Sequence, residues 1–101
     1  MSEPSSDAAL ARAVVRVSGQ VQGVGFRWWA SRQAGRLGLV GHATNEWDGS
    51  VEVDCQGPPA DVDALVEALT GARVPGRPGR VASWHVERRS PDAGLVGFET
   101  R

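Results

Sequence analysis

The sequence predicts a single α+β domain in which two helices cover one face of a mostly antiparallel sheet. The expected element order is β-α-β-β-α-β with a short last strand. Apolar and polar residues alternate in several short segments, two other segments repeat apolar residues at helical spacing, and glycine or proline separates them. This order is typical of a split βαβ arrangement, which buries one sheet face under the helices and leaves the other in water.

Length and composition limit the number of domains. At 101 residues the chain suits one domain and is too short for two. It is 41% hydrophobic and 23% charged, which is typical of a soluble globular protein. No segment approaches the roughly 18 apolar residues that a membrane helix needs. We expect a domain over residues 13–101, preceded by a loose leader at residues 1–12 that is rich in serine and acidic residues.

The charged residues and the cysteine count exclude several classes of function. With 11 basic and 12 acidic residues the net charge is -1, which argues against nucleic-acid binding through bulk charge. Every basic residue is arginine, so lysine Schiff-base and phosphate-loop lysine chemistry are excluded. Cys55 stands alone, which excludes an internal disulfide or a multi-cysteine metal site. We expect Cys55 to be a small core residue of a monomeric, cytoplasmic protein.

The first strand and the first helix flank a glycine-rich loop. Residues 13–18 alternate apolar and polar side chains and predict a strand. From Phe26 onward apolar residues recur at helical spacing, and Gly38 is a natural end for the helix. The apolar face of this helix consists of Phe26, Ala30, Ala34 and Leu37.

The second half of the chain repeats this organisation. Residues 39–45 and 50–56 predict two strands, joined by a hairpin turn at Asp48 and Gly49. On the second of these strands we expect Glu52 and Asp54 to face solvent. Further along we predict a helix after Pro58-Pro59 that ends at Gly71, a Gly/Pro/Arg-rich loop at 71–80, and strands at 81–88 and 94–100. The apolar stripe of the second helix is Val62, Leu65, Val66 and Leu69.

The segment from Gly19 to Arg27 carries the residues that suggest chemistry. Backbone N–H groups at a helix start lack helical partners, and the helix dipole adds partial positive charge, so this place suits a phosphate. Glycines let the backbone curl around an anion, and Arg27 can add a bidentate contact. Neither the phosphate-loop lysine motif nor the GxGxxG spacing is present. On composition alone, a tight strand-to-helix connection with an exposed arginine is an equally good interpretation.

Two motifs resemble those of a known family. The segment GQVQGVGFR is similar to the acylphosphatase signature G-x-V-Q-G-V-x-F-R. The second signature of that family, an asparagine followed by two residues and Asp-Gly, is matched by Asn45 to Gly49 at a fitting distance from Arg27. The segment LGLVG before Asn45 and a Gln-Gly after the third strand fit as well. The resemblance covers residues 13–101.

The resemblance implies a ferredoxin-like α/β sandwich that hydrolyses the carboxyl–phosphate bond of acyl phosphates without a metal or another cofactor. The loop that would bind the substrate phosphate consists of Gln22, Gly23, Val24, Gly25, Phe26 and Arg27. Arg27 and Asn45 would be the catalytic residues, with Arg27 on the phosphate and Asn45 positioning the attacking water. The implied partners are a small-molecule acyl phosphate and inorganic phosphate, as product and inhibitor, with no nucleic acid or membrane.

Three features depart from the family pattern. Residues 42–44 read His-Ala-Thr, where the family has an aromatic residue, an apolar residue and an arginine. Trp28 and Trp29 are bulky for a helix start, and we favour packing or partial exposure over a place at the pocket mouth. The loop at 71–80 is unusually rich in glycine, proline and arginine, and would either alter substrate access or simply connect two elements.

Two other functions stay open at this point. A non-catalytic module of the same fold would bind phosphate or an acyl phosphate without hydrolysing it, like the acylphosphatase-like domains of larger carbamoyl-transfer maturation proteins. RNA-binding domains share the split βαβ layout but present aromatic residues on their central strands. The polar faces of the central strands here carry Arg16, Ser18, Glu52 and Asp54 instead. His42 and His85 are lone histidines on strands, for which we expect no catalytic role.

Overall fold

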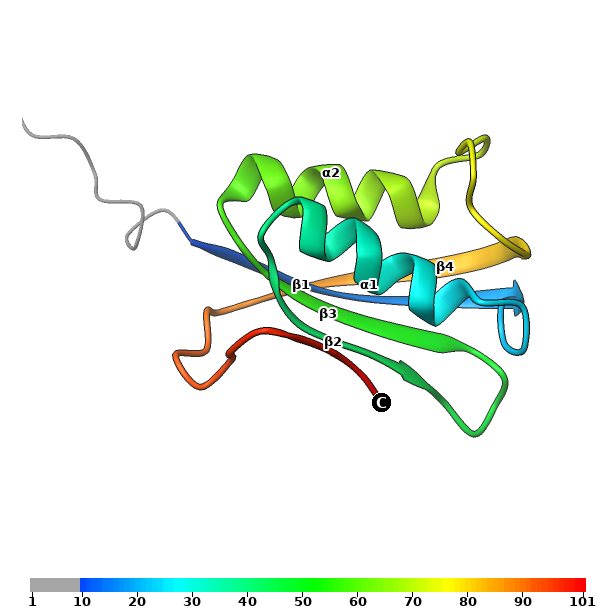
Figure 1. Ribbon diagram of the computed structural model, residues 1–101, viewed down its shortest axis with the longest axis horizontal. Coiled ribbons are helices and arrows are strands. Elements are labelled where there is room, and N and C mark those ends of the chain that lie inside the picture. The colour runs from blue at the N-terminus through cyan, green and yellow to red at the C-terminus, as the bar shows by residue number, and fades with distance from the viewer. Residues whose placement is uncertain (1–9) are drawn as a thin grey trace, which may run out of the picture.

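The computed structural model describes residues 10–101, so residues 1–9 of the predicted leader lie outside the described part. The five strands form one sheet in the order β4-β1-β3-β2-β5, and both helices cover the same face of it (Figure 1). The strands are β1 (Ala11–Gln20), β2 (Val40–Asn45), β3 (Val51–Gly57), β4 (Arg80–Arg89) and β5 (Phe98–Thr100), and the helices are α1 (Phe26–Arg36) and α2 (Pro59–Thr70). The predicted fold class and element order are confirmed.

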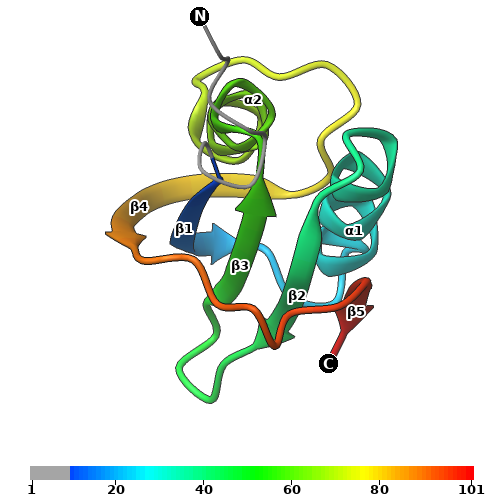
Figure 2. The ribbon, with the colours of Figure 1, turned by 90° about the vertical axis from the view of Figure 1, so that its left-hand side faces the viewer.

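Strand pairing is antiparallel except at one edge. β1 lies between β3 and β4, and β2 pairs with β3, all in antiparallel register. β5 adds to β2 in parallel, so the connection after β4 must pass from one edge of the sheet to the other. Figure 2 shows this connection running from β4 past β3 to β5. The last strand is therefore shorter than the predicted 94–100, because residues 94–97 belong to the connection rather than to the sheet.

The core lies between the sheet and the two helices, where alternate side chains of β1 and β3 meet the apolar faces of α1 and α2. Each helix contributes residues at the spacing that the sequence predicted, although Leu37 and Val66 are only partly buried. Burial of these apolar groups supplies the main favourable term in folding. The fully buried helix residues are Phe26, Ala30, Ala34, Val62, Leu65 and Leu69.

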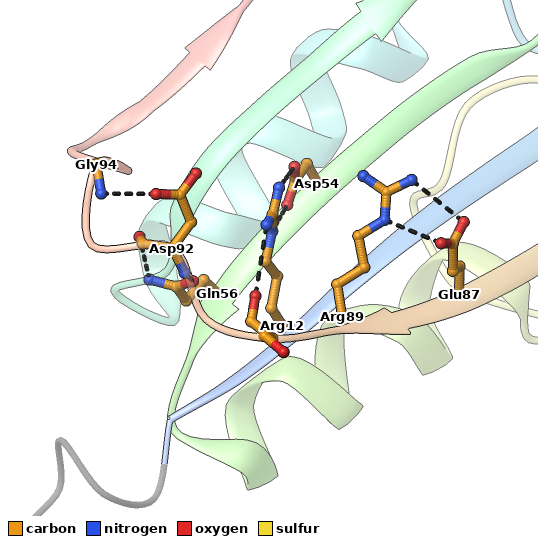
Figure 3. A network of polar contacts seen from close by, with 8 residues as sticks. Arg12, Asp54, Gln56, Glu87, Arg89, Asp92 and Gly94 are labelled. Atoms are coloured by element: carbon orange, nitrogen blue, oxygen red, sulfur yellow. Dashed lines mark hydrogen bonds and ion pairs between the residues drawn. The ribbon is translucent and has the colours of Figure 1, made fainter.

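The opposite face of the sheet is less solvated than expected, because the connection to β5 covers part of it. The Asp54 carboxylate, predicted to face solvent, is 5% exposed and accepts two hydrogen bonds from Arg12, of 3.0 and 2.7 Å. The hydrogen bond with Asp54 is the main cause of a raised pKa of Arg12. Beside this pair, Gln56 exchanges two hydrogen bonds with the main chain of Asp92 (Figure 3). These contacts hold the connection in the place from which β5 reaches β2.

Cys55 is a buried core residue, as predicted. Burial is the main cause that raises the pKa of its thiol to about 12. A group whose pKa rises on folding keeps its proton more tightly in the folded chain, so its contribution to stability is lost as the pH climbs from about 9 toward 12.

We expect iodoacetamide at about pH 8 to leave Cys55 unmodified in the native protein and to alkylate it after denaturation. Equal alkylation rates in both states, measured by mass spectrometry, would contradict this expectation.

Candidate functional site

The loop between β1 and α1 has the backbone conformation of an anion-binding turn. Gly23 and Gly25 adopt left-handed φ angles of 76° and 86°, which side-chain-bearing residues seldom adopt. The first helical hydrogen bond of α1 runs from the N–H of Trp29 to the carbonyl of Gly25, and no side chain of the described residues caps the helix. The N–H groups of residues 26–28 therefore have no helical acceptor and are available to a ligand.

A pocket of about 200 Å³ opens at this helix start. Arg27 from α1 and Asn45 from the end of β2 both line it, so the structure brings the two predicted catalytic residues together. Of the predicted phosphate-binding residues, Gln22 and Val24 are not part of the lining. The lining consists of Val21, Gly23, Gly25, Phe26, Arg27, Trp28, Asn45 and Thr100.

The Gln22 side chain points to the neighbouring hairpin rather than into the pocket. Its amide nitrogen donates to the carbonyls of Glu46 and Ser50, at 2.7 and 2.8 Å. These two acceptors lie in the turn between β2 and β3, directly after Asn45. The Asp48 carboxylate braces the same turn by accepting hydrogen bonds from the hydroxyl and the N–H of Ser50, which lower the pKa of Asp48. Gln22 thus fixes the loop relative to Asn45.

Loss of the Gln22 amide should loosen this arrangement. In Gln22→Met we expect the free energy of unfolding to fall by about 1–2 kcal/mol, since each of two partly buried hydrogen bonds contributes about 1 kcal/mol. The rate of acyl phosphate hydrolysis should fall as well, because the loop is no longer held in a fixed position relative to Asn45. Gln20→Met, at an exposed position of β1, is the matched control. We would measure thermal unfolding and steady-state kinetics for both variants. If the two variants gave the same results, Gln22 would not fix the loop relative to Asn45.

Two residues that were not predicted from the sequence contribute to the site, namely Thr100 at the end of β5 and Arg101 directly after it. Thr100 lines the pocket, and a terminal nitrogen of Arg27 donates a hydrogen bond to the main-chain oxygen of Arg101. Arg101 is itself held by its N–H, which donates to the carbonyl of Ala43 at 2.7 Å. The guanidinium is therefore oriented by a residue 74 positions away along the chain. No local sequence pattern signals such a contact.

The departures from the family pattern on β2 lie away from the pocket. Ala43 is fully buried in the core, and His42 and Thr44 alternate with it onto the opposite face of the sheet. Asn45 keeps its register, paired with Val51 of β3. The changed residues therefore leave the pocket lining intact. The Nδ1 atom of His42 is buried and has no hydrogen-bond partner among residues 10–101.

The two tryptophans at the start of α1 and His85 lie in three different surroundings. Trp28 is 60% exposed, which agrees with the favoured prediction of partial exposure, and it also lines the pocket, a place that the sequence did not favour. Trp29 packs against Phe26 with a ring separation of 5.6 Å. His85 lines a separate depression on the sheet face that the helices leave uncovered.

Within residues 10–101, neither helix has the length and hydropathy required to cross a bilayer. In the same part of the chain, no group of three or more His, Cys, Asp or Glu side chains is arranged to hold a metal ion.

Comparisons with known proteins give a consistent result. The sequence model of the acylphosphatase family matches residues 13–100. An acylphosphatase of Saccharopolyspora erythraea is 45% identical over 96 residues, which cover 95% of this chain and 98% of the relative. One from Corynebacterium diphtheriae is 48% identical, with coverages of 90% and 95%. The crystal structure of an acylphosphatase from Bacillus subtilis matches with a TM-score of 0.79 and 30% identity, covering 90% of this chain and 98% of that one.

Proposed function

This chain belongs to the acylphosphatase family, the hydrolases that convert acyl phosphates to a carboxylate and phosphate, and we propose how its own residues carry out that reaction. Arg27 and the loop of residues 22–27 bind the phosphate, and Asn45 positions the attacking water. The observation that carries the proposal is the shared pocket, in which a guanidinium, uncapped N–H groups and a primary amide meet. No metal and no other cofactor takes part in the proposed reaction.

Phosphate binding rests on charge and on directed donors. The N–H groups at the start of α1 and the positive end of the helix dipole favour an anion there. Arg27 adds a full positive charge and a planar set of N–H donors that fits phosphate oxygens. One of its terminal nitrogens is engaged by Arg101, which fixes the orientation of the plane. A preoriented donor spends less conformational entropy when the ligand binds.

In this proposal Asn45 acts on the attacking water by positioning it and does not remove its proton. The neutral amide of Asn45 is too weak a base to remove a proton, but its oxygen can accept a hydrogen bond from water and hold it in line with the phosphorus. The bond between water oxygen and phosphorus forms as the bond from phosphorus to the acyl oxygen breaks. The proton of the water passes to a phosphate oxygen of the substrate, and the carboxylate departs with the bonding electrons.

The leaving group removes the need for an acid. The conjugate acid of a carboxylate has a pKa of about 4, so the departing oxygen requires no proton at neutral pH. Phosphoryl transfer then depends mainly on positioning and on stabilisation of the developing charge. Both functions are assigned to groups in the pocket, and neither His42 nor His85 lines it.

The alternative of a binding module without catalysis has less support. The chain spans 98% and 95% of two relatives named acylphosphatase. Binding of RNA on the open sheet face is disfavoured because arginines there are already paired, Arg12 with Asp54 and Arg16 with Glu52. We also infer a monomer in the cytoplasm, for which the balanced charge and the lone buried Cys55 are the support.

Hydrolysis of benzoyl phosphate in the presence of excess chelator tests the proposal. We expect inorganic phosphate release well above the uncatalysed rate, undiminished by the chelator. The matched observation is the melting temperature, which inorganic phosphate should raise if it binds the folded protein. Protection by phosphate without any turnover would instead establish the binding module.

A further inference from the structure

A second hollow, which we call the arginine groove, adjoins the phosphate pocket. It has a volume of about 370 Å³ and runs along α1, with the exposed face of the helix on one side and Pro75 and Gly76 on the other. The helix side is formed by Trp28, Arg32 and Arg36. Gly25 and Trp28 line both the groove and the phosphate pocket. A ligand whose phosphate sits in the pocket can therefore extend into the groove without a break.

The charge in the arginine groove is positive and unbalanced. Neither Arg32 nor Arg36 forms an ion pair within residues 10–101, and none of the described residues that line the groove is acidic. The sequence of α1, FRWWASRQAGR, contains three arginines and no acid. The two arginines follow Trp28 at successive helical turns, about 6 and 12 Å along the axis. Within the described part of the chain, the groove therefore holds two arginines without an acidic partner.

Arg32 is already ordered for binding. Its guanidinium carbon lies 5.1 Å from the centre of the Trp28 ring, in a cation–π contact. Such a contact uses the face of the guanidinium and leaves its edge, which carries the N–H donors, for a carboxylate or a phosphate. The exposed part of the indole, in turn, offers an apolar surface next to the phosphate pocket.

The opposite wall of the arginine groove is anchored rather than loose. Arg77 donates hydrogen bonds to the carbonyls of Ala68 and Leu69 at the end of α2, both at 3.1 Å. Gly79 packs so closely on the end of β1 that an added Cβ would lie 2.0 Å from the carbonyl oxygen of Gln20. The Gly/Pro/Arg-rich loop thus shapes one side of the groove, and is more than a connection between α2 and β4.

The geometry of the reaction also favours the arginine groove as the place of the acyl group. In-line displacement places the leaving group opposite the attacking water. Asn45, which positions that water, is on β2, which lies below α1 in the view of Figure 1, whereas the loop of residues 71–79 lies above α1. The acyl group therefore leaves on the side away from Asn45, toward the arginine groove.

We propose that the arginine groove is the acyl subsite and that it selects acyl phosphates whose acyl group carries a second anion, a carboxylate or a phosphate, at its far end. Trp28 contacts the body of the acyl group, and Arg32 and Arg36 bind the distal anion. This inference rests on the proposed function, because it takes the phosphate end of the substrate to lie against Arg27. It adds a substrate class to that function.

The test compares two substrates that differ by one charge, benzoyl phosphate and 4-carboxybenzoyl phosphate. The measured quantity is the ratio of their kcat/KM values, which we call the carboxylate preference. We expect Arg32→Gln and Arg36→Gln, combined in one variant, to lower the preference about fivefold, the upper end of what an exposed ion pair supplies. Raising the salt concentration should lower the preference of the wild type in the same direction.

Arg88→Gln is the matched control, since it removes one positive charge from β4, where Arg88 pairs with the exposed Asp63. It should keep the wild-type preference. Acetyl phosphate, whose methyl group is too short to reach the arginines, serves as the internal reference for each variant.

A carboxylate preference that is equal in the wild type and the double variant would overturn the acyl subsite while leaving the proposed function intact. Absence of turnover with all three substrates would overturn the proposed function itself. A parallel series with an acyl phosphate bearing a distal phosphate then decides which anion is preferred.

Discussion

Replacement of Arg27 by alanine should abolish phosphate binding and reduce kcat/KM for acyl phosphates by at least about 10³. Loss of one preoriented donor at a developing charge commonly costs about 10²–10³ in rate, and Arg27 supplies both a full charge and more than one donor. The variant should also lose the rise in melting temperature that inorganic phosphate gives the wild type. Its fold should persist, because the Arg27 side chain lies at the pocket rather than in the core.

Arg27→Lys separates charge from geometry. Lysine keeps the positive charge but presents it as a compact point, without the planar fork that can contact Arg101 and phosphate together. We expect partial recovery of phosphate protection and little recovery of turnover. Arg88→Ala, at an exposed position of β4, controls for the change in net charge. Full activity in Arg27→Lys would show that charge alone is required and that the orientation imposed by Arg101 is unimportant.

The elements of the fold were predictable because each one carries its pattern locally. Alternation on β3 and helical spacing on α2 follow directly from which side chains are buried. The boundaries were less predictable, since they depend on partners. β1 and β4 extend to ten residues each because they pair with one another over nearly their whole length, and β1 begins at Ala11, two residues before the predicted start.

Burial on the open sheet face shows a limit of local patterns. The alternation around Asp54 predicted a solvated carboxylate, and its direction toward the open face was right. Its burial depends on Arg12 and on the connection to β5, which come from opposite ends of the chain. A polar residue on a strand is therefore consistent with solvent or with an ion pair beneath a crossing segment, and sequence periodicity does not separate the two.

The candidate site likewise has a part that local sequence patterns predict and a part that they do not. Its loop and Asn45 were found because each belongs to a contiguous motif. The Gln22 contacts with the hairpin and the hydrogen bond between Arg27 and Arg101 join segments that are distant in sequence. These contacts set the orientation of the motif residues, and they become visible only once the strand order places β5 beside β2.

Replacement of Asn45 by alanine should reduce turnover by about 10²–10³ while phosphate still binds and still raises the melting temperature. The amide oxygen is assigned to the water and not to the phosphate, so its loss acts on the reaction step rather than on ground-state binding. The structure favours an unchanged fold, since Asn45 is exposed at the end of β2. Thr44→Ala, on the same strand but facing the other side of the sheet, is the matched control and should keep its activity.

Asn45→Asp sharpens this prediction. The aspartate has nearly the same shape and still offers an oxygen to water, but its negative charge lies in the pocket that receives the phosphate. We therefore expect it to weaken phosphate protection, which Asn45→Ala should leave intact, and to lower turnover further. If Asn45→Ala instead lost phosphate binding as completely as Arg27→Ala does, Asn45 would belong to the phosphate site, and another group would have to orient the water.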